Sequence, residues 1–178
     1  CEPSSCELAI GHKGKAQIKI VTEGISAHGS APEKGENAVY KMAEMIRRVE
    51  DLSNELLRKG RESGTVVLAN ITCETASLNA IPVKCSIDLD RRISEAENED
   101  LVKKEMDKII KGTEAKWEIA KVYRTSWTGH EVIYYPFHPA WAIDLNHELT
   151  KAAFRAYESV NEKKPKPIKW DFSTNAVA

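Results

Sequence analysis

Apolar and polar residues alternate along parts of the chain with the two-residue period of a β-strand. The alternation is cleanest from 83 to 93, where one face would carry Val83, Cys85, Ile87 and Leu89 and the other Lys84, Ser86, Asp88, Asp90 and Arg92. A similar alternation runs from 16 to 21, and β-rich runs lie at 65–72 and 115–123. The pattern therefore predicts four strands.

Between these strands the apolar residues recur at helical spacing. The stretch from 35 to 57 predicts one helix. Ser94 and Glu97 have the spacing of a capping box, which predicts that a second helix begins there and continues to Ile110, with Gly112 after its end. A third helix is expected from 144 to 159.

The resulting order, β-α-β-β-α-β, is typical of the split βαβ or ferredoxin-like arrangement, in which both helices cover one face of an antiparallel sheet. The expected fold class is therefore α+β, with a more polar open sheet face. An irregular, aromatic-rich segment at 124–145 is interpreted as a crossing between domains.

Composition excludes several classes of protein. The 178 residues include 26 basic and 27 acidic ones, so the net charge is −1 and no basic footprint of a nucleic-acid binder is present. No apolar run reaches the roughly 18 residues needed to span a membrane, and the first residues do not resemble a signal peptide. We therefore expect a cytoplasmic protein without membrane or nucleic-acid partners. The absence of an initiator Met and of a polar tail suggests a fragment of a longer protein.

Three polar residues stand at positions suited to chemistry. His28 lies in a turn of small residues between a strand and a helix, Asn79 lies in a second turn, and Arg92 lies on the strand that follows. Together they offer a donor to an oxyanion, a carboxamide and a fork for a carboxylate. Each also has a structural alternative: a capping histidine, a turn residue, and an ion pair with Asp88 or Asp90.

The motifs, taken in order, resemble those of the zinc-dependent amidohydrolase family that includes acetylornithine deacetylase, succinyl-diaminopimelate desuccinylase, aminoacylase and carboxypeptidase G. The matching segments are Cys1-Glu2-Pro3-Ser4, Gly14 to Gly24 with His28 and Pro32, Gly35 to Ala38, Leu78 to Pro82, and Asp90-Arg91-Arg92. Ser126 to Gly129 and Trp170 to Asn175 are most similar to the branch labelled selenium-metabolism hydrolases.

This resemblance implies a catalytic α/β domain with two zinc ions per subunit, or cobalt or manganese in their place, and a lid that forms a homodimer. It implies that Glu2 is a metal ligand and that His28 stabilises the oxyanion in the partner's active site. Asn79 and Arg92 match substrate-binding positions, and Thr174 and Asn175 lie near the family's substrate contacts. Cys1 replaces a customary glycine, Asn175 departs from a Gly-rich pattern, and the other metal ligands of the family have no counterpart here.

We therefore predict a catalytic-domain remnant at 1–10, a ferredoxin-like lid at 11–127 and a returning catalytic segment at 128–178. The parent enzyme is expected to be a metallopeptidase or amidohydrolase that cleaves a peptide, N-acyl or N-carbamoyl bond of a small carboxylate-bearing substrate by metal-activated water. The chain alone is expected to be inactive. The alternative is a non-catalytic ferredoxin-like dimerisation or binding module.

Overall fold

The computed structural model describes residues 6–60 and 62–174. Its strands are β1 (Leu8–His12), β2 (Gly14–Glu23), β3 (Thr65–Glu74), β4 (Lys84–Ile93), β5 (Lys116–Ile119), β6 (Val122–Thr125), β7 (Glu131–Tyr134), β8 (Phe137–His138), β9 (Trp141–Ala142) and β10 (Pro167–Trp170). Its helices are the 3₁₀ turn η1 (Pro32–Lys34) and the α-helices α1 (Ala38–Lys59), α2 (Glu99–Ile110) and α3 (Glu148–Asn161).

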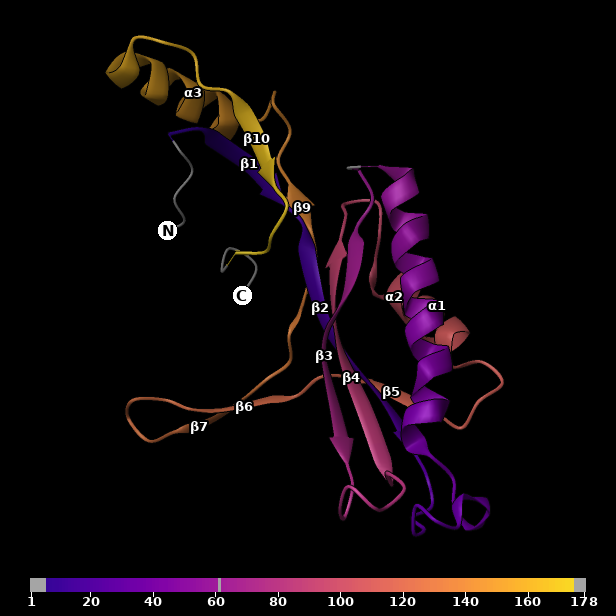
Figure 1. The fold of residues 1–178 in the computed structure, drawn as a ribbon. Coiled ribbons are helices and arrows are strands. Elements are labelled where there is room, and N and C mark those ends of the chain that lie inside the picture. Colours follow the sequence, from indigo (N-terminus) through magenta and orange to yellow (C-terminus); the bar gives the residue numbers. More distant parts are fainter. Residues whose placement is uncertain (1–5, 61, 175–178) are drawn as a thin grey trace.

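The main sheet has the strand order β3-β4-β2-β5 with antiparallel neighbours, and β8 pairs with the start of β2. Helices α1 and α2 lie on the same face of this sheet, as Figure 1 shows. This order places a strand between the two that flank α1, which is the split βαβ arrangement. The predicted α+β, ferredoxin-like fold is confirmed.

The core lies between this sheet and its two helices. Strands β2 and β4 pair without interruption from Gly14 opposite Ile93 to Glu23 opposite Lys84. Because side chains alternate between faces, this register turns one apolar row from each strand toward the helices. The buried residues packed there include Ala16, Ile18, Ile20, Cys85, Ile87 and Leu89 of the sheet, and Met42, Met45, Val49, Val102 and Met106 of the helices.

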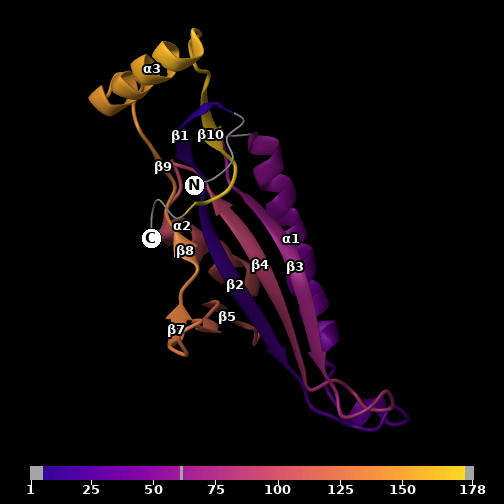
Figure 2. The same cartoon turned by 90° about the vertical axis from the view of Figure 1, so that its left-hand side faces the viewer.

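A second, smaller sheet has the order β10-β1-β9 and is accompanied by α3 (Figure 2). The chain passes directly from β1 into β2, so this sheet adjoins one end of the main sheet. Strands β6 and β7 form a separate hairpin that extends away from the main sheet (Figure 1). In the described part of the chain, no helix is long and apolar enough to cross a membrane.

Three local predictions were wrong. Helix α2 begins at Glu99, where the Asn98 side chain accepts a hydrogen bond from the backbone of Leu101, and not at the predicted capping box. Residues 115–123 do not form one strand, because β5 belongs to the main sheet and β6 to the hairpin. The segment at 124–145 contains most of the hairpin and the short strands β8 and β9, so it is more regular than expected.

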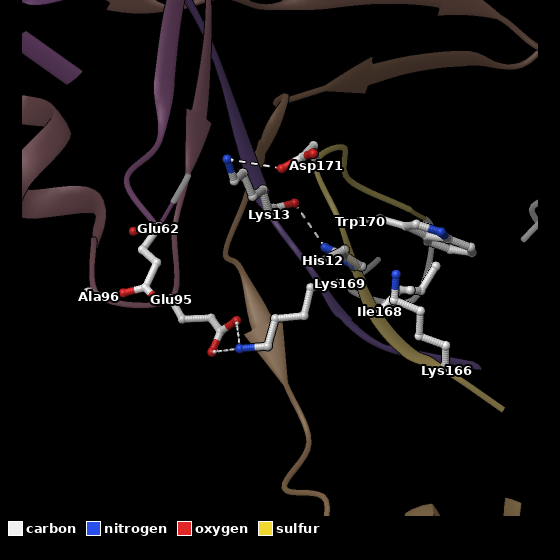
Figure 3. A pocket seen from close by; sticks show the side chains of 11 residues that line it. His12, Lys13, Glu62, Glu95, Ala96, Lys166, Ile168, Lys169, Trp170 and Asp171 are labelled. Carbon is white, nitrogen blue, oxygen red and sulfur yellow. Dashed lines mark hydrogen bonds and ion pairs between the residues drawn. The ribbon is translucent and has the colours of Figure 1, made fainter. Parts of the chain in front are cut away.

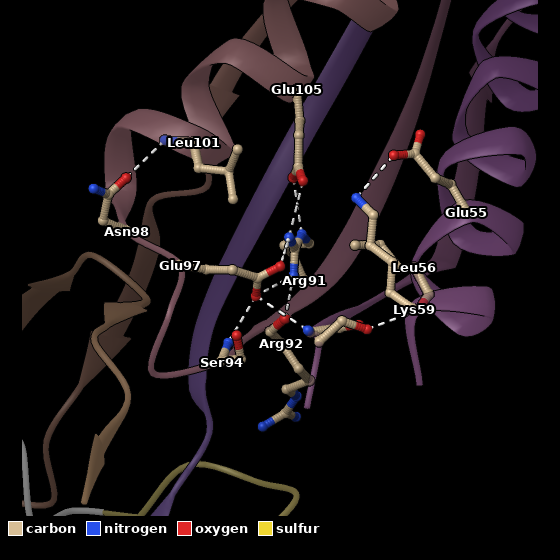
Figure 4. A network of polar contacts seen from close by, with 12 residues as sticks. Glu55, Leu56, Lys59, Arg91, Arg92, Ser94, Glu97, Asn98, Leu101 and Glu105 are labelled. Carbon is tan, nitrogen blue, oxygen red and sulfur yellow. Dashed lines mark hydrogen bonds and ion pairs between the residues drawn. The ribbon is translucent and has the colours of Figure 1, made fainter. Parts of the chain in front are cut away.

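The failed capping box has a physical cause in the buried guanidinium of Arg91 (Figure 4). Arg91 is 0% exposed and donates to Glu97 at 2.8 Å and to Glu105 of α2 at 2.9 Å. Glu97 does accept from the backbone N–H of Ser94 at 2.7 Å, as a capping box requires, but its second oxygen is held by Arg91. The loop is therefore fixed to β4, and the N-cap of the helix is Asn98, four residues after the predicted N-cap Ser94.

We predict that Arg91→Met lowers the free energy of unfolding by about 3–5 kcal/mol, because it leaves two buried carboxylates without their cation. Arg47→Met, at an exposed position of α1, is the matched control and should change stability by less than about 0.5 kcal/mol. Urea denaturation of both variants measures the difference. Equal effects would show that the buried cluster is not important for stability.

The same cluster predicts acid sensitivity. Burial pushes the pKa of Glu97 upward, but the hydrogen bonds from Arg91 and from the Ser94 backbone hold it below its ordinary value. A carboxyl with a lowered folded pKa stabilises the fold above its unfolded pKa of about 4.3, and this stabilisation is lost as the pH falls through the folded pKa.

We therefore expect Glu97→Gln to be less stable than the original chain at pH 7 and to lose less of its remaining stability on acidification. Unfolding curves between pH 7 and pH 3 test this. Glu50→Gln on the exposed side of α1 is the control and should keep the original pH dependence. An equally steep acid loss in Glu97→Gln would contradict the assignment.

Candidate substrate-binding site

His28 and Asn79 lie on two adjacent loops at one end of the main sheet, which we call the tip. The loop at 24–31 follows β2, and the loop at 75–83 joins β3 to β4. Gly29 donates its backbone N–H to the oxygen of Asn79 at 2.7 Å, and Ile81 donates to Ala27 at 2.9 Å. These bonds form a short antiparallel bridge between His28 and Ala80. Both predicted side chains are exposed, so they are available to a ligand.

The imidazole of His28 is oriented from within its own turn. Its Nδ1 lies 3.1 Å from the backbone nitrogen of Ser30, which donates to it, and 2.7 Å from the Ser30 hydroxyl. Ala31 donates its backbone N–H to His28 O at 2.9 Å and closes the turn. The ring is thus held through one nitrogen.

Close backbone packing fixes the tip where apolar packing is sparse. A Cβ on Gly24 would overlap the backbone oxygen of Glu36 and lie 2.8 Å from the nitrogen of Ala38. Glycine is therefore required for this loop to pass beside the start of α1. Ile25 and Glu36 also exchange two backbone hydrogen bonds, each of 2.9 Å.

Arg92 lies at the opposite end of β4, which we call the hinge end because β1 and the smaller sheet adjoin it there. From Lys84 to Arg92 the strand spans about 26 Å at about 3.3 Å per residue. The guanidinium binds Asp90 on the same strand face, with Nε 2.7 Å from one carboxylate oxygen and Nη2 3.0 Å from the other. The structure thus brings His28 and Asn79 together and separates Arg92 from them.

The remaining predicted residues belong to the ends of the chain. Thr174 follows β10 and is half-buried. The end of β10 lies at the hinge end of the main sheet, where Lys13 donates its backbone N–H to Trp170 O at 2.9 Å. Glu2 and Asn175 lie outside the described residues.

The sequence profile of the M20 peptidase dimerisation domain matches residues 10–118, which include β2 to β4, α1, α2 and most of β5. This match covers more than half of the chain. The chain belongs to the M20 hydrolase family.

Individual relatives agree with this assignment. The uncharacterized protein YgeY of Escherichia coli K12 is 32% identical over 184 residues, which cover 99% of this chain and 45% of YgeY. A succinyl-diaminopimelate desuccinylase of Rickettsia bellii is 25% identical over 107 residues, which cover 58% of this chain and 27% of that enzyme. The chain thus spans less than half the length of these curated relatives.

Solved structures share the fold at lower identity. The aminopeptidase PepT of Bacillus cereus has a TM-score of 0.66 at 18% identity, and the match covers 96% of this chain and 42% of PepT. A tripeptidase of Staphylococcus aureus has a TM-score of 0.67 at 16% identity, covering 95% of this chain and 41% of the tripeptidase. In both cases the similarity extends beyond the M20 dimerisation domain to the smaller sheet.

The M20 family is generally metal-dependent, so side chains that could coordinate a metal ion bear on the chemistry of this chain. Within 6–60 and 62–174, no group of three or more His, Cys, Asp or Glu side chains is placed to hold a metal ion. The described residues therefore do not fit a two-metal centre, and we assign no chemical step of this chain to a metal.

A cavity of about 580 Å³ lies at the hinge end, between β10, the end of β1 and the loop after β4 (Figure 3). Ion pairs stand at its border: Lys169 with Glu95 at 2.7 Å, and Lys13 with Asp171 at 3.2 Å. The Lys169–Glu95 pair links β10 of the smaller sheet to the loop that follows β4 of the main sheet. His12, buried beside it, bonds through Nδ1 to the oxygen of Lys13 at 2.9 Å.

Sequence reasoning missed two residues of this M20 domain. Arg91 falls on the apolar side of β4 by simple alternation from Leu89, and a cation at such a position needs a buried carboxylate partner. This signal was present in the sequence. Ser30 had no such signal, because its contact with His28 depends on the turn conformation.

We predict that Gly24→Ala destabilises the domain by about 1–3 kcal/mol, as overpacking commonly does, and shifts the amide NMR signals of the tip. Gly29→Ala is the matched control, because its Cβ would lie 3.2 Å from Asn79 O and needs only a small adjustment. Thermal unfolding and ¹H–¹⁵N spectra compare the two variants. If Gly24→Ala were as well tolerated as Gly29→Ala, close packing would not be what positions His28.

Proposed function

We propose that this chain is the lid, with adjoining catalytic segments, of a longer dizinc hydrolase that cleaves an amide bond of a small carboxylate-bearing substrate. The family assignment and the span of only 45% of YgeY support this proposal. The two zinc ions of the family pattern would be held mainly by residues outside the described part of this chain. This part would bind and orient the substrate.

The separation of Arg92 from His28 and Asn79 carries the proposal. A span of about 26 Å along β4 exceeds the length of a dipeptide or an N-acyl amino acid, so one lid does not present all three groups to one such molecule. Two copies related by a two-fold axis can do so, because one copy then supplies the tip and the other the hinge end. We infer that each site combines the His28 and Asn79 of one protomer with the Arg92 of its partner.

The lid has a surface suited to such a dimer. Strand β3 is at the edge of the main sheet as described and exposes Val67 and Ile71, at 57% and 48%. An exposed edge strand of ten residues is a template for pairing with a second chain. This edge supports a homodimer through the lid.

Each polar group then has a defined task. His28 would donate a hydrogen bond to the carbonyl oxygen that becomes negative during hydrolysis, and Asn79 would bind the substrate. Arg92, which donates from Nη2 to Asp90 in this structure, would bind the substrate carboxylate with its guanidinium. The substrate carboxylate would therefore either replace Asp90 as the partner of Arg92 or bind Arg92 beside Asp90.

One observation favours the alternative function, a dimerisation or binding module without catalysis. Arg92 is paired with Asp90, and His28 is bonded to Ser30, so both residues have a structural role without a ligand. The two functions differ in what happens when these residues are changed in the longer protein.

We predict that His28→Ala and Arg92→Ala each lower kcat/KM of the full-length, zinc-loaded protein by about 10²-fold or more on a panel of dipeptides and N-acyl amino acids. A mixture of the two variants, unfolded and reassembled together, should recover about a quarter of the original activity. Half of the dimers are then mixed, and each mixed dimer has one intact site of two.

The mixture of His28→Ala with Asn79→Ala is the matched control and should recover nothing, because both changes lie at the tip. Recovery in neither mixture would mean that one protomer supplies all three groups. Full activity of each single variant would instead favour the non-catalytic module.

A further inference from the structure

We propose that Ser30 is a positioning residue that sets the orientation and the tautomer of His28, so that the ring proton is on Nε2. This inference deepens the proposed function and rests on it for its catalytic consequence. The hydrogen bonds that support it are independent of that function.

The first step concerns the direction of the hydrogen bond to Nδ1. The backbone N–H of Ser30 lies 3.1 Å from this nitrogen and can only donate. Nδ1 must therefore accept with its lone pair. A neutral imidazole carries one N–H, so the proton is on Nε2.

The second step concerns the hydroxyl. Ser30 Oγ lies 2.7 Å from the same nitrogen, and because Nδ1 already accepts, the hydroxyl also donates to it. Two donors from one residue thus converge on Nδ1 and fix the rotation of the ring as well as its tautomer. Moving the proton to Nδ1 would place it against the backbone N–H of Ser30, whereas the hydroxyl, which can also accept, would not oppose it.

The third step concerns the turn that makes this contact possible. Ala31 donates to His28 O at 2.9 Å, which folds residues 28–31 so that Ser30 returns toward the ring. Gly29, between them, donates to Asn79 O at 2.7 Å and ties the turn to the second loop. Ser30 is therefore placed by the same contacts that bring His28 and Asn79 together.

The catalytic consequence follows from the sign of the charge on the acceptor. A developing oxyanion needs an N–H donor, and Nε2–H is the donor of the tautomer that Ser30 selects. The other tautomer would present a lone pair to the oxyanion and repel it. Ser30 acts only through His28.

The tautomer can be measured in this chain by long-range ¹H–¹⁵N spectra of a sample labelled with ¹⁵N-histidine, in which His28→Ala identifies the signal. We expect a protonated Nε2 and an unprotonated Nδ1 for His28. In Ser30→Ala, which keeps the backbone donor but loses the hydroxyl, the proton should stay on Nε2, and the Nδ1 shift should move because one of its two accepted hydrogen bonds is lost. Ser30→Thr should restore the original shifts.

In the full-length enzyme, Ser30→Ala should lower kcat about fivefold with little change in KM, which corresponds to the loss of one ordinary hydrogen bond. Ser30→Thr should recover most of the activity. Ser26→Ala is the matched control, because Ser26 is exposed in the same loop and has no hydrogen bond to His28.

A proton on Nδ1 in the original chain, or unchanged shifts and kcat in Ser30→Ala, would overturn the positioning role. Failure of the proposed function has a different signature: His28→Ala would keep full activity while the Nε2 tautomer and the movement of the Nδ1 shift in Ser30→Ala remained measurable.

Discussion

The uninterrupted pairing of β2 with β4 is the constraint on which the rest of the structure depends. Its register, from Gly14 opposite Ile93 to Glu23 opposite Lys84, determines which side chains enter the core. A slip by one residue would move every side chain of a strand to the other face. The same pairing sets the length of the main sheet, and therefore the distance between the tip and the hinge end.

The register also explains why a cation lies inside the domain. Leu89 faces the core, so Arg91 must face it too, and its charge is compatible with burial only because Glu97 and Glu105 accept its hydrogen bonds. Burial would lower the pKa of Arg91, but the two carboxylates hold it above the ordinary value. The loop before α2 is thus positioned by an ion-pair cluster rather than by a helix cap.

Periodicity in the sequence was enough to predict the ferredoxin-like fold of the main sheet and its two helices, because these strands and helices each have one buried face. It was not enough where the decisive partner lies far away in the sequence. Glu97 fits a capping box locally, and only the arrival of Arg91 from β4 changes its role. The hairpin of β6 and β7 was missed because both of its faces are largely exposed, which removes the alternation on which strand prediction depends.

His28, Asn79 and Arg92 were proposed as a set from their positions in two turns and on a strand and from the family resemblance. The sequence did not reveal that the loops of the first two are joined by backbone bonds and that the third lies at the other end of β4. The tip is exposed and gains little from apolar burial, so backbone bridges and close glycine contacts give it the rigidity that a binding loop needs. The domain thus holds these polar groups at its two ends, about 26 Å apart along β4.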